Sequence, residues 1–121
     1  EGAQHPWLRW FLSGHRNASP ADPIRHGMLQ ASYYGLMNEV DDNLARLFEA
    51  MKRNGDWSRT LIVLTSDHGE QMGDHWMLGK AGYFDQSYHV PLIVRDPDAR
   101  ADASRGRVFD AFTEHVDLMP T

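Results

Sequence analysis

The stretch TLIVLTSDHGEQMGDHWMLGK, residues 60–80, decides the fold and holds the candidate site. Four consecutive apolar residues, 61–64, predict a strand that is buried on both faces, as in a mainly parallel central sheet flanked by helices. Asp67 and His68, two side chains able to bind a metal ion, lie just beyond the carboxyl end of this strand, where open α/β sheets place their ligands. Gly69 allows the chain to turn sharply away from the sheet. The stretch therefore predicts an α/β fold.

The composition is that of a globular protein with one small domain. A chain of 121 residues, 41% hydrophobic and 24% charged, has enough apolar side chains for one core and is too short for two. The net charge of −5 argues against a nucleic-acid partner, because no basic face is left to neutralise phosphates. No apolar run approaches the roughly 20 residues of a membrane span, so no membrane partner is expected. The absence of cysteine excludes disulfides and thiolate metal sites.

Both ends of the chain look cut. The sequence begins at Glu1 rather than at methionine, and it stops at Thr121 with no helix-ending signal. We therefore expect a piece of a larger protein. No signal peptide is visible, and a cytoplasmic location is favoured over a periplasmic one.

The strongest periodic pattern in the sequence predicts a long amphipathic helix over residues 23–53. Asp22 is a suitable N-cap with Pro23 at the first helical position, and Asn54 and Gly55 supply a left-handed end. We expect the apolar stripe of this helix to pack against the sheet. The stripe consists of Tyr33, Leu36, Met37, Val40, Leu44, Leu47, Phe48 and Met51.

The other segments are shorter. We expect residues 1–22 to form an irregular lead-in, in which the aromatic cluster around Trp7 makes one or two helical turns. We favour a patch that packs on the parent protein, and the alternative for this cluster is a binding site. Residues 90–94 predict a second strand and residues 107–112 a third, and a further helix begins at residue 113.

Asp67 and His68 are adjacent, so in a regular strand their side chains would point to opposite faces. They can share one metal ion only where the strand breaks into a turn, and Gly69 supplies that break. The alternative for Asp67 is a cap for the next helix. A catalytic triad made from Ser66, Asp67 and His68 is excluded, because a base cannot reach both partners when all three are consecutive.

Lys80 and His75 lie in the glycine-spaced loop that follows. The Lys80 ammonium group is suited to contact a sulfate or phosphate oxygen, and the alternative is a solvated loop lysine. For His75 we favour a structural role, in which it holds the loop by hydrogen bonds. The remaining histidines have no partner pattern and are interpreted as structural or surface residues: His5, His15, His26, His89 and His115.

Three short motifs occur in order in this stretch: TSDHGE at residues 65–70, GDH at residues 73–75 and LGK at residues 78–80. Together they resemble the sulfatases of the alkaline phosphatase superfamily, and most of all the phosphonate monoester hydrolase and phosphodiesterase branch. The resemblance covers residues 25–121 and implies an alkaline phosphatase-like fold. It also includes YYG at residues 33–35, EVDD at residues 39–42, VPLI at residues 90–93 and DLMPT at residues 117–121.

The resemblance implies that residues 1–121 are the carboxyl-side part of a single catalytic domain, with the strands and the metal-site loop in residues 60–121. By position, Asp67 and His68 would bind one divalent metal ion and Lys80 would contact the anionic oxygens of the substrate. Many sulfatases have asparagine in place of His68, and an imidazole shifts the preference from calcium towards manganese, zinc or iron.

The nucleophile of the family lies outside this chain. In the family it is a formylglycine made from the cysteine or serine of a Cys/Ser-x-Pro-x-Arg motif near the start of the enzyme, together with further metal-binding aspartates. Neither feature occurs in this sequence.

We therefore expect part of a metal-dependent hydrolase of small anionic esters: sulfate esters, phosphate mono- or diesters, or phosphonate monoesters. A homo-oligomeric parent is left open. One alternative is a non-catalytic module that retains the fold, which an upstream Cys-x-Pro-x-Arg motif would all but exclude. The other is a superfamily relative with two metal ions and a serine or threonine nucleophile, against which the single-metal pattern argues weakly.

Overall fold

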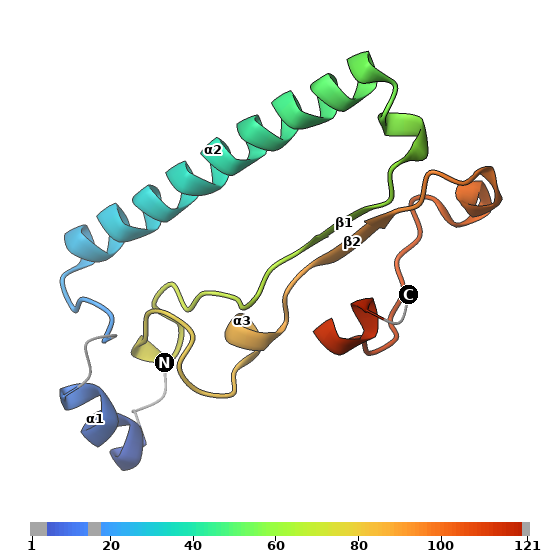
Figure 1. Ribbon diagram of the computed structural model, residues 1–121. Coiled ribbons are helices and arrows are strands. Elements are labelled where there is room, and N and C mark those ends of the chain that lie inside the picture. Colours follow the sequence, from blue (N-terminus) through green and yellow to red (C-terminus); the bar gives the residue numbers. More distant parts are fainter. Residues whose placement is uncertain (1–4, 15–17, 120–121) are drawn as a thin grey trace.

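The computed structural model describes residues 5–14 and 18–119, and its elements are arranged as Figure 1 shows. Two α-helices come first, α1 (Pro6–Ser13) and α2 (Pro23–Asn54), followed by the turn η1 (Trp57–Arg59) and the strand β1 (Ile62–Thr65). The long loop after β1 contains the turn η2 (Asp74–Trp76) and the short helix α3 (Asp85–Tyr88), and leads into β2 (Leu92–Arg95). The turns η3 (Ala99–Ser104) and η4 (His115–Leu118) complete the chain.

Helix α2 begins and ends where its capping residues predict. The Asp22 carboxylate accepts a hydrogen bond of 3.0 Å from the backbone N–H of Ile24, and Pro23 occupies the first turn. At the other end Gly55 adopts a φ of 78°, and its backbone N–H donates to the carbonyl of Lys52. Because these signals act within a few residues, the helix bounds follow from the sequence alone. The aromatic cluster of the lead-in forms α1.

The prediction that α2 packs against the sheet is wrong. Figure 1 shows the helix standing apart from the two strands, and α2 meets η1 through the edge-on contact of Phe48 with Trp57, 5.5 Å between ring centroids. Half of its stripe is solvent-exposed, with Leu36 62% and Val40 58% accessible, and the other half is partly accessible. Its 32 residues extend about 48 Å, whereas a strand of four residues extends about 13 Å, so strands of this length could cover only part of the stripe.

The two strands pair antiparallel, with Ile62 opposite Arg95 and Thr65 opposite Leu92. The mainly parallel sheet expected from the sequence is therefore not formed by the strands that the structure describes. A parallel pair needs a crossover of a dozen or more residues that carries the chain back along the sheet. The connection here contains only the short elements η2 and α3 and returns the chain to the same end of the sheet. An antiparallel strand is common in sheets that are otherwise parallel.

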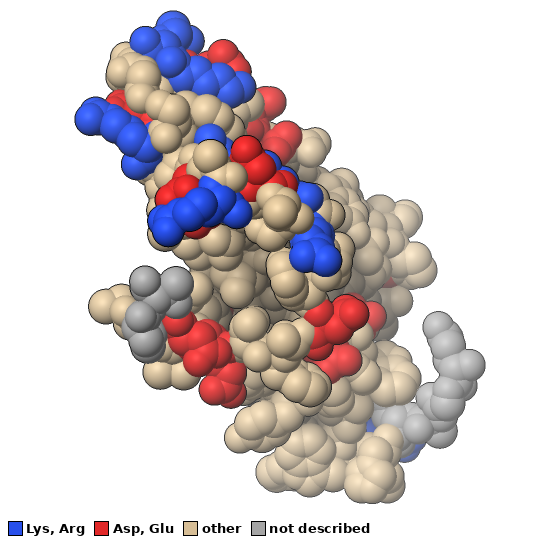
Figure 2. Space-filling view, turned by 90° about the vertical axis from the view of Figure 1, so that its right-hand side faces the viewer, with Lys and Arg blue, Asp and Glu red and all other residues tan. Residues whose placement is uncertain are grey.

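The predicted burial of β1 on both faces is also wrong, since Val63 is 42% and Leu64 38% accessible. Figure 2 shows a face in which large areas carry neither acidic nor basic side chains, in agreement with this exposure of apolar residues.

The third strand predicted at residues 107–112 is not formed, and the helix predicted from residue 113 is reduced to the single turn η4. The first segment is extended, but no strand of the described residues pairs with it. Its side chains are accordingly exposed, Val108 at 88% and Phe109 at 71%. An extended segment becomes a strand only when a neighbour takes up its backbone hydrogen bonds.

The most buried side chains lie in and beside the loop that follows β1: Gln71, Met77 and Ser87, each at most 2% accessible. The loop is tied to the first turns of α2, where Gln30 donates a side-chain hydrogen bond of 3.2 Å to the carbonyl of Met72. The most buried side chains therefore lie around the loop that carries the candidate site. Among the described residues, no helix combines the length and apolar character that a membrane crossing requires.

Candidate metal centre

Asp67 and His68 lie directly after β1, at the point where the strand ends and the chain turns. Their side chains approach each other, with 3.3 Å between Asp67 Oδ2 and His68 Nε2. The Asp67 side chain is 83% accessible and that of His68 is 35% accessible. In a regular strand neighbouring side chains point to opposite faces, whereas this turn brings both side chains to one side.

A hydrogen bond determines which nitrogen of the neutral His68 ring carries the proton. Its Nδ1 lies 2.8 Å from the carbonyl oxygen of Gly69, and because a carbonyl can only accept, Nδ1 carries a proton. In the neutral ring the lone pair is then on Nε2, which faces the carboxylate of Asp67. Two acceptors at this distance repel each other unless a proton or a cation lies between them. Histidines that bind a metal ion through one ring nitrogen usually donate a hydrogen bond from the other, as His68 does to the Gly69 carbonyl.

The pair fits a single divalent ion in donor type and in spacing. Carboxylate oxygen and imidazole nitrogen bind such ions at about 2.0 to 2.2 Å, so in tetrahedral coordination neighbouring ligand atoms lie about 3.3 to 3.6 Å apart. The separation of 3.3 Å falls in this range. In the part of the chain that the structure describes, no third histidine, aspartate or glutamate joins them in a metal-binding group. These residues supply two ligands of a site.

Three backbone contacts hold the segment that bears the two ligands. The Ser66 hydroxyl donates to the carbonyl of His68 over 2.7 Å, and the Ser66 carbonyl accepts from the His115 ring at the same distance. The Gly69 N–H donates to the carbonyl of Ser87 over 2.8 Å. Here the chain packs so closely that a Cβ on Gly69 would collide with the backbone of Gln86. Glycine is therefore required at this position by space.

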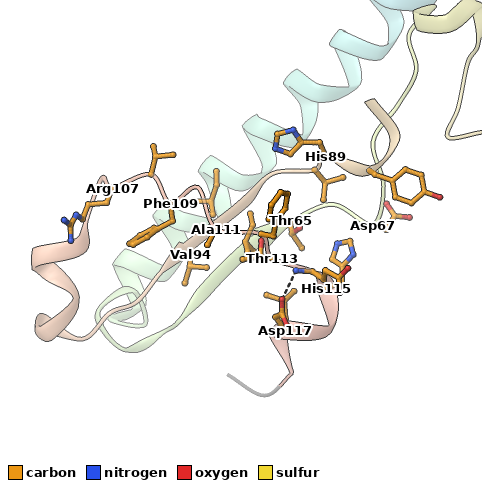
Figure 3. A pocket seen from close by; sticks show the side chains of 18 of the residues that line it. Thr65, Asp67, His89, Val94, Arg107, Phe109, Ala111, Thr113, His115 and Asp117 are labelled. Atoms are coloured by element: carbon orange, nitrogen blue, oxygen red, sulfur yellow. Dashed lines mark hydrogen bonds between the residues drawn. The ribbon is translucent and has the colours of Figure 1, made fainter. Parts of the chain in front are cut away.

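Lys80, Asp67 and His68 line the same open cavity, of about 2090 Å³. Figure 3 shows this cavity between the end of β1, the segment at residues 107–113 and η4. Lys80 is exposed and belongs to the loop that follows β1. The structure thus brings all three predicted site residues to one cavity, with His89 and His115 as further lining residues.

His75 makes a different contact from the hydrogen bonds expected of it. Its ring stacks on Phe84, with 3.7 Å between centroids and planes 11° apart, and its backbone has a φ of 53°. The hydrogen bonds expected to hold the loop through this side chain are thus replaced by a ring contact, and a structural role for His75 stays a prediction. Of the other histidines, His5 and His26 make local structural hydrogen bonds. His15 lies outside the described residues.

Three residues near the site were missed by reasoning from the sequence. Glu70 and Gln71 contact the loop on either side of Lys80, and His115 reaches Ser66 from a distant turn. Glu70 and Gln71 follow the ligand pair after a single glycine, and this closeness in sequence could have identified them as candidates. His115 has no such signal, because nothing in the spacing connects it with Ser66.

The family model described as Sulfatase matches residues 11–121 of this chain. The multifunctional alkaline phosphatase superfamily protein PehA of Trinickia caryophylli is 38% identical over 131 residues, which covers 100% of this chain and 25% of PehA. An arylsulfatase of Clostridium perfringens (strain 13 / Type A) is 35% identical over 92 residues, covering 76% of this chain and 19% of the relative. The chain thus spans about a quarter or less of the length of these relatives.

Solved structures also resemble the chain, two of them phosphonate monoester hydrolases. The crystal structure of the phosphonate monoester hydrolase of Agrobacterium radiobacter matches with a TM-score of 0.55 and 62% sequence identity, over 56% of this chain and 14% of that one. The phosphonate monoester hydrolase of Silicibacter pomeroyi matches with a TM-score of 0.59 and 44% identity, over 60% of this chain and 14% of that one. The chain is therefore similar to these two hydrolases in backbone structure as well as in sequence.

Proposed function

Since this chain belongs to the sulfatase family of the alkaline phosphatase superfamily, we propose that the protein hydrolyses a sulfate ester, a phosphate mono- or diester, or a phosphonate monoester. The family and the alkaline phosphatase-like α/β fold class expected from the sequence are confirmed. Relatives named arylsulfatase and phosphonate monoester hydrolase support a hydrolase acting on a small anionic ester.

The observation that carries the proposal is the approach of Asp67 Oδ2 and His68 Nε2 to 3.3 Å at the end of β1. These two side chains would hold one divalent ion, and the imidazole favours manganese, zinc or iron over calcium. A divalent ion bound there supplies Lewis-acid polarisation of a sulfate or phosphate oxygen. The Gly69 carbonyl keeps the His68 ring in the tautomer that presents Nε2.

Lys80 contributes a positive charge on the same cavity. Its ammonium group would contact the non-bridging oxygens of the ester, where negative charge increases as the leaving group departs. Because lysine carries its charge as a compact point, it suits a tetrahedral anion of either sulfur or phosphorus. The charge alone does not distinguish the two elements.

The sulfatase family implies a metal ion and a formylglycine in general. This sequence has no cysteine and no Ser-x-Pro-x-Arg motif. We therefore place the nucleophile in a part of the protein outside residues 1–121. The remaining metal ligands belong there as well, because Asp67 and His68 are two ligands, and such ions take four or more.

The test compares the full-length protein with its two single variants, Asp67→Asn and His68→Ala. Each protein is assayed with an activated aryl sulfate, an aryl phosphodiester and an aryl phosphonate. We expect most of the turnover and bound metal to be lost while the circular dichroism spectrum stays unchanged, because both residues lie at a strand end and outside the core. Asp110→Asn is the matched control, since Asp110 is an exposed carboxylate of the same loop-rich region.

Wild-type turnover and metal content in both variants would overturn the ligand assignment. A wild-type protein that turns over none of the three substrates would favour the non-catalytic module. Two ions per chain in the wild-type protein would favour the two-metal relative.

A further inference from the structure

The loop that carries Lys80 is closed at its base by two hydrogen bonds to Gly79. The backbone N–H of Gln71 donates to the Gly79 carbonyl over 2.8 Å. The backbone N–H of Gly79 in turn donates to the carboxylate of Glu70. Both backbone polar groups of Gly79 are thus engaged by two consecutive residues, which fixes the peptide units on both sides of Gly79, up to Lys80.

A third hydrogen bond fixes the other side of Lys80. The side-chain amide of Gln71 donates to the Ala81 carbonyl over 2.6 Å and to the Ser87 hydroxyl over 2.9 Å. Because the Ala81 carbonyl can only accept, this contact also determines which end of the amide faces it. Gln71 has no accessible surface, so water does not compete for these bonds.

The clasp formed by Glu70 and Gln71 begins two residues after the ligand pair. Asp67 and His68 therefore share a short, tied segment with the residues that hold Gly79 and Ala81. Lys80 itself is exposed and carries a long side chain with several rotatable bonds. The backbone on both sides of it must be fixed before its ammonium group has a defined place on the cavity.

Gln71 is an unusual residue for a purely structural position. Its Oε1 atom is buried and has no hydrogen-bond partner among the described residues. A buried acceptor without a partner destabilises the folded state, and a methionine of similar size would avoid it. What the glutamine contributes is its amide N–H groups, and these hold Ala81 and Ser87.

We infer that Glu70 and Gln71 are positioning residues for Lys80, acting through the backbone of Gly79 and Ala81. The inference rests on the proposed function, in which Lys80 contacts the anionic oxygens of the substrate. It makes a specific claim: the effect of Glu70 on turnover passes through Lys80 and not through the metal ligands.

A double-mutant cycle in the full-length protein tests this claim. Glu70→Ala is made in the wild-type protein and in Lys80→Ala, and kcat/KM is measured with the best of the three aryl substrates. In the wild-type background we expect a loss on the order of 10- to 100-fold, typical of a displaced catalytic group. In the Lys80→Ala background we expect a further loss of less than about threefold, because the group that Glu70 positions is already gone. Bound metal should be unchanged in both.

The controls separate positioning from folding. Glu70→Gln keeps an acceptor oxygen for the Gly79 N–H and should retain most of the activity. Glu39→Ala removes an exposed carboxylate from α2 and should have no effect. If Glu70→Ala does not fold, the same double-mutant cycle is measured with Gln71→Met in its place. Its matched control is Gln86→Met, because Gln86 is exposed.

Equal losses in the two backgrounds, or no loss in either, would overturn the inference. Failure of the proposed function looks different: Asp67→Asn and Lys80→Ala would then leave turnover unchanged, whatever Glu70→Ala does.

Discussion

The ring of His115 donates a hydrogen bond of 2.7 Å to the carbonyl oxygen of Ser66, a residue 49 positions earlier in the sequence. The Ser66 carbonyl is the last one before Asp67, and the Ser66 hydroxyl donates to the carbonyl of His68. The turn η4 is thus anchored to the segment that bears both predicted metal ligands. Through this contact, a residue outside the predicted ligand pair holds the start of the site in place.

We predict that His115→Ala in the full-length protein weakens metal binding by roughly 10-fold, as is typical when a group that supports a ligand is removed. His115→Gln, which still offers an N–H group, should restore part of the affinity. The measurement is a metal titration, with His5→Ala as the control because His5 caps α1. Unchanged affinity in His115→Ala would mean that the contact with Ser66 has no part in holding the ligands.

Lys80→Ala should lower turnover on the order of 10²-fold or more, comparable to removing one electrostatic donor from the transition state of another enzyme. Bound metal should stay at the wild-type level, since Lys80 is not among the predicted ligands. Steady-state kinetics and metal analysis of the same preparation check both statements. A joint loss of metal and activity would show that the loop was disturbed and not only its charge.

Gly69→Ala should lower metal content and turnover together by about 10-fold or more, on the scale of a displaced catalytic group. The added methyl group meets the backbone of Gln86, so the segment with Asp67 and His68 must shift. Gly35→Ala is the matched control. Gly35 lies inside α2 with open space around it, so there the same change should stabilise the protein by about 0.8 to 1.0 kcal/mol. Wild-type activity in Gly69→Ala would show that the loop accommodates a side chain.

Residues 1–121 expressed alone should show no turnover with manganese, zinc or calcium. The chain has no cysteine to become formylglycine, and two protein ligands leave a divalent ion largely to water. It should also aggregate, because α2 and both strands expose apolar side chains. The test is an assay of the purified chain with aryl sulfate and phosphodiester substrates. Metal-dependent turnover that disappears in Asp67→Asn would contradict the prediction, since the site would then be complete within these residues.

The sequence by itself determined the local features. The bounds of α2 followed from Asp22, Pro23 and Gly55, because a cap acts on backbone groups within one turn of itself. The strand β1 followed from its apolar run. The convergence of Asp67 and His68 was expected only where the strand breaks into a turn, and both residues lie in the bend that follows β1. The family was also readable from the sequence, because the three motifs after β1 occur in a fixed order.

Only the tertiary structure decided which distant segments meet. The antiparallel pairing of β1 with β2 depends on where the connecting loop turns back, and no pattern within either strand records that. The same holds for the contact of His115 with Ser66 and for the clasp of Glu70 and Gln71 around Lys80. The apolar stripe of α2 predicted burial against the sheet, and residues 107–112 predicted a third strand. A periodic pattern shows that a segment is suited to a partner, and it forms the contact only where the fold places one beside it.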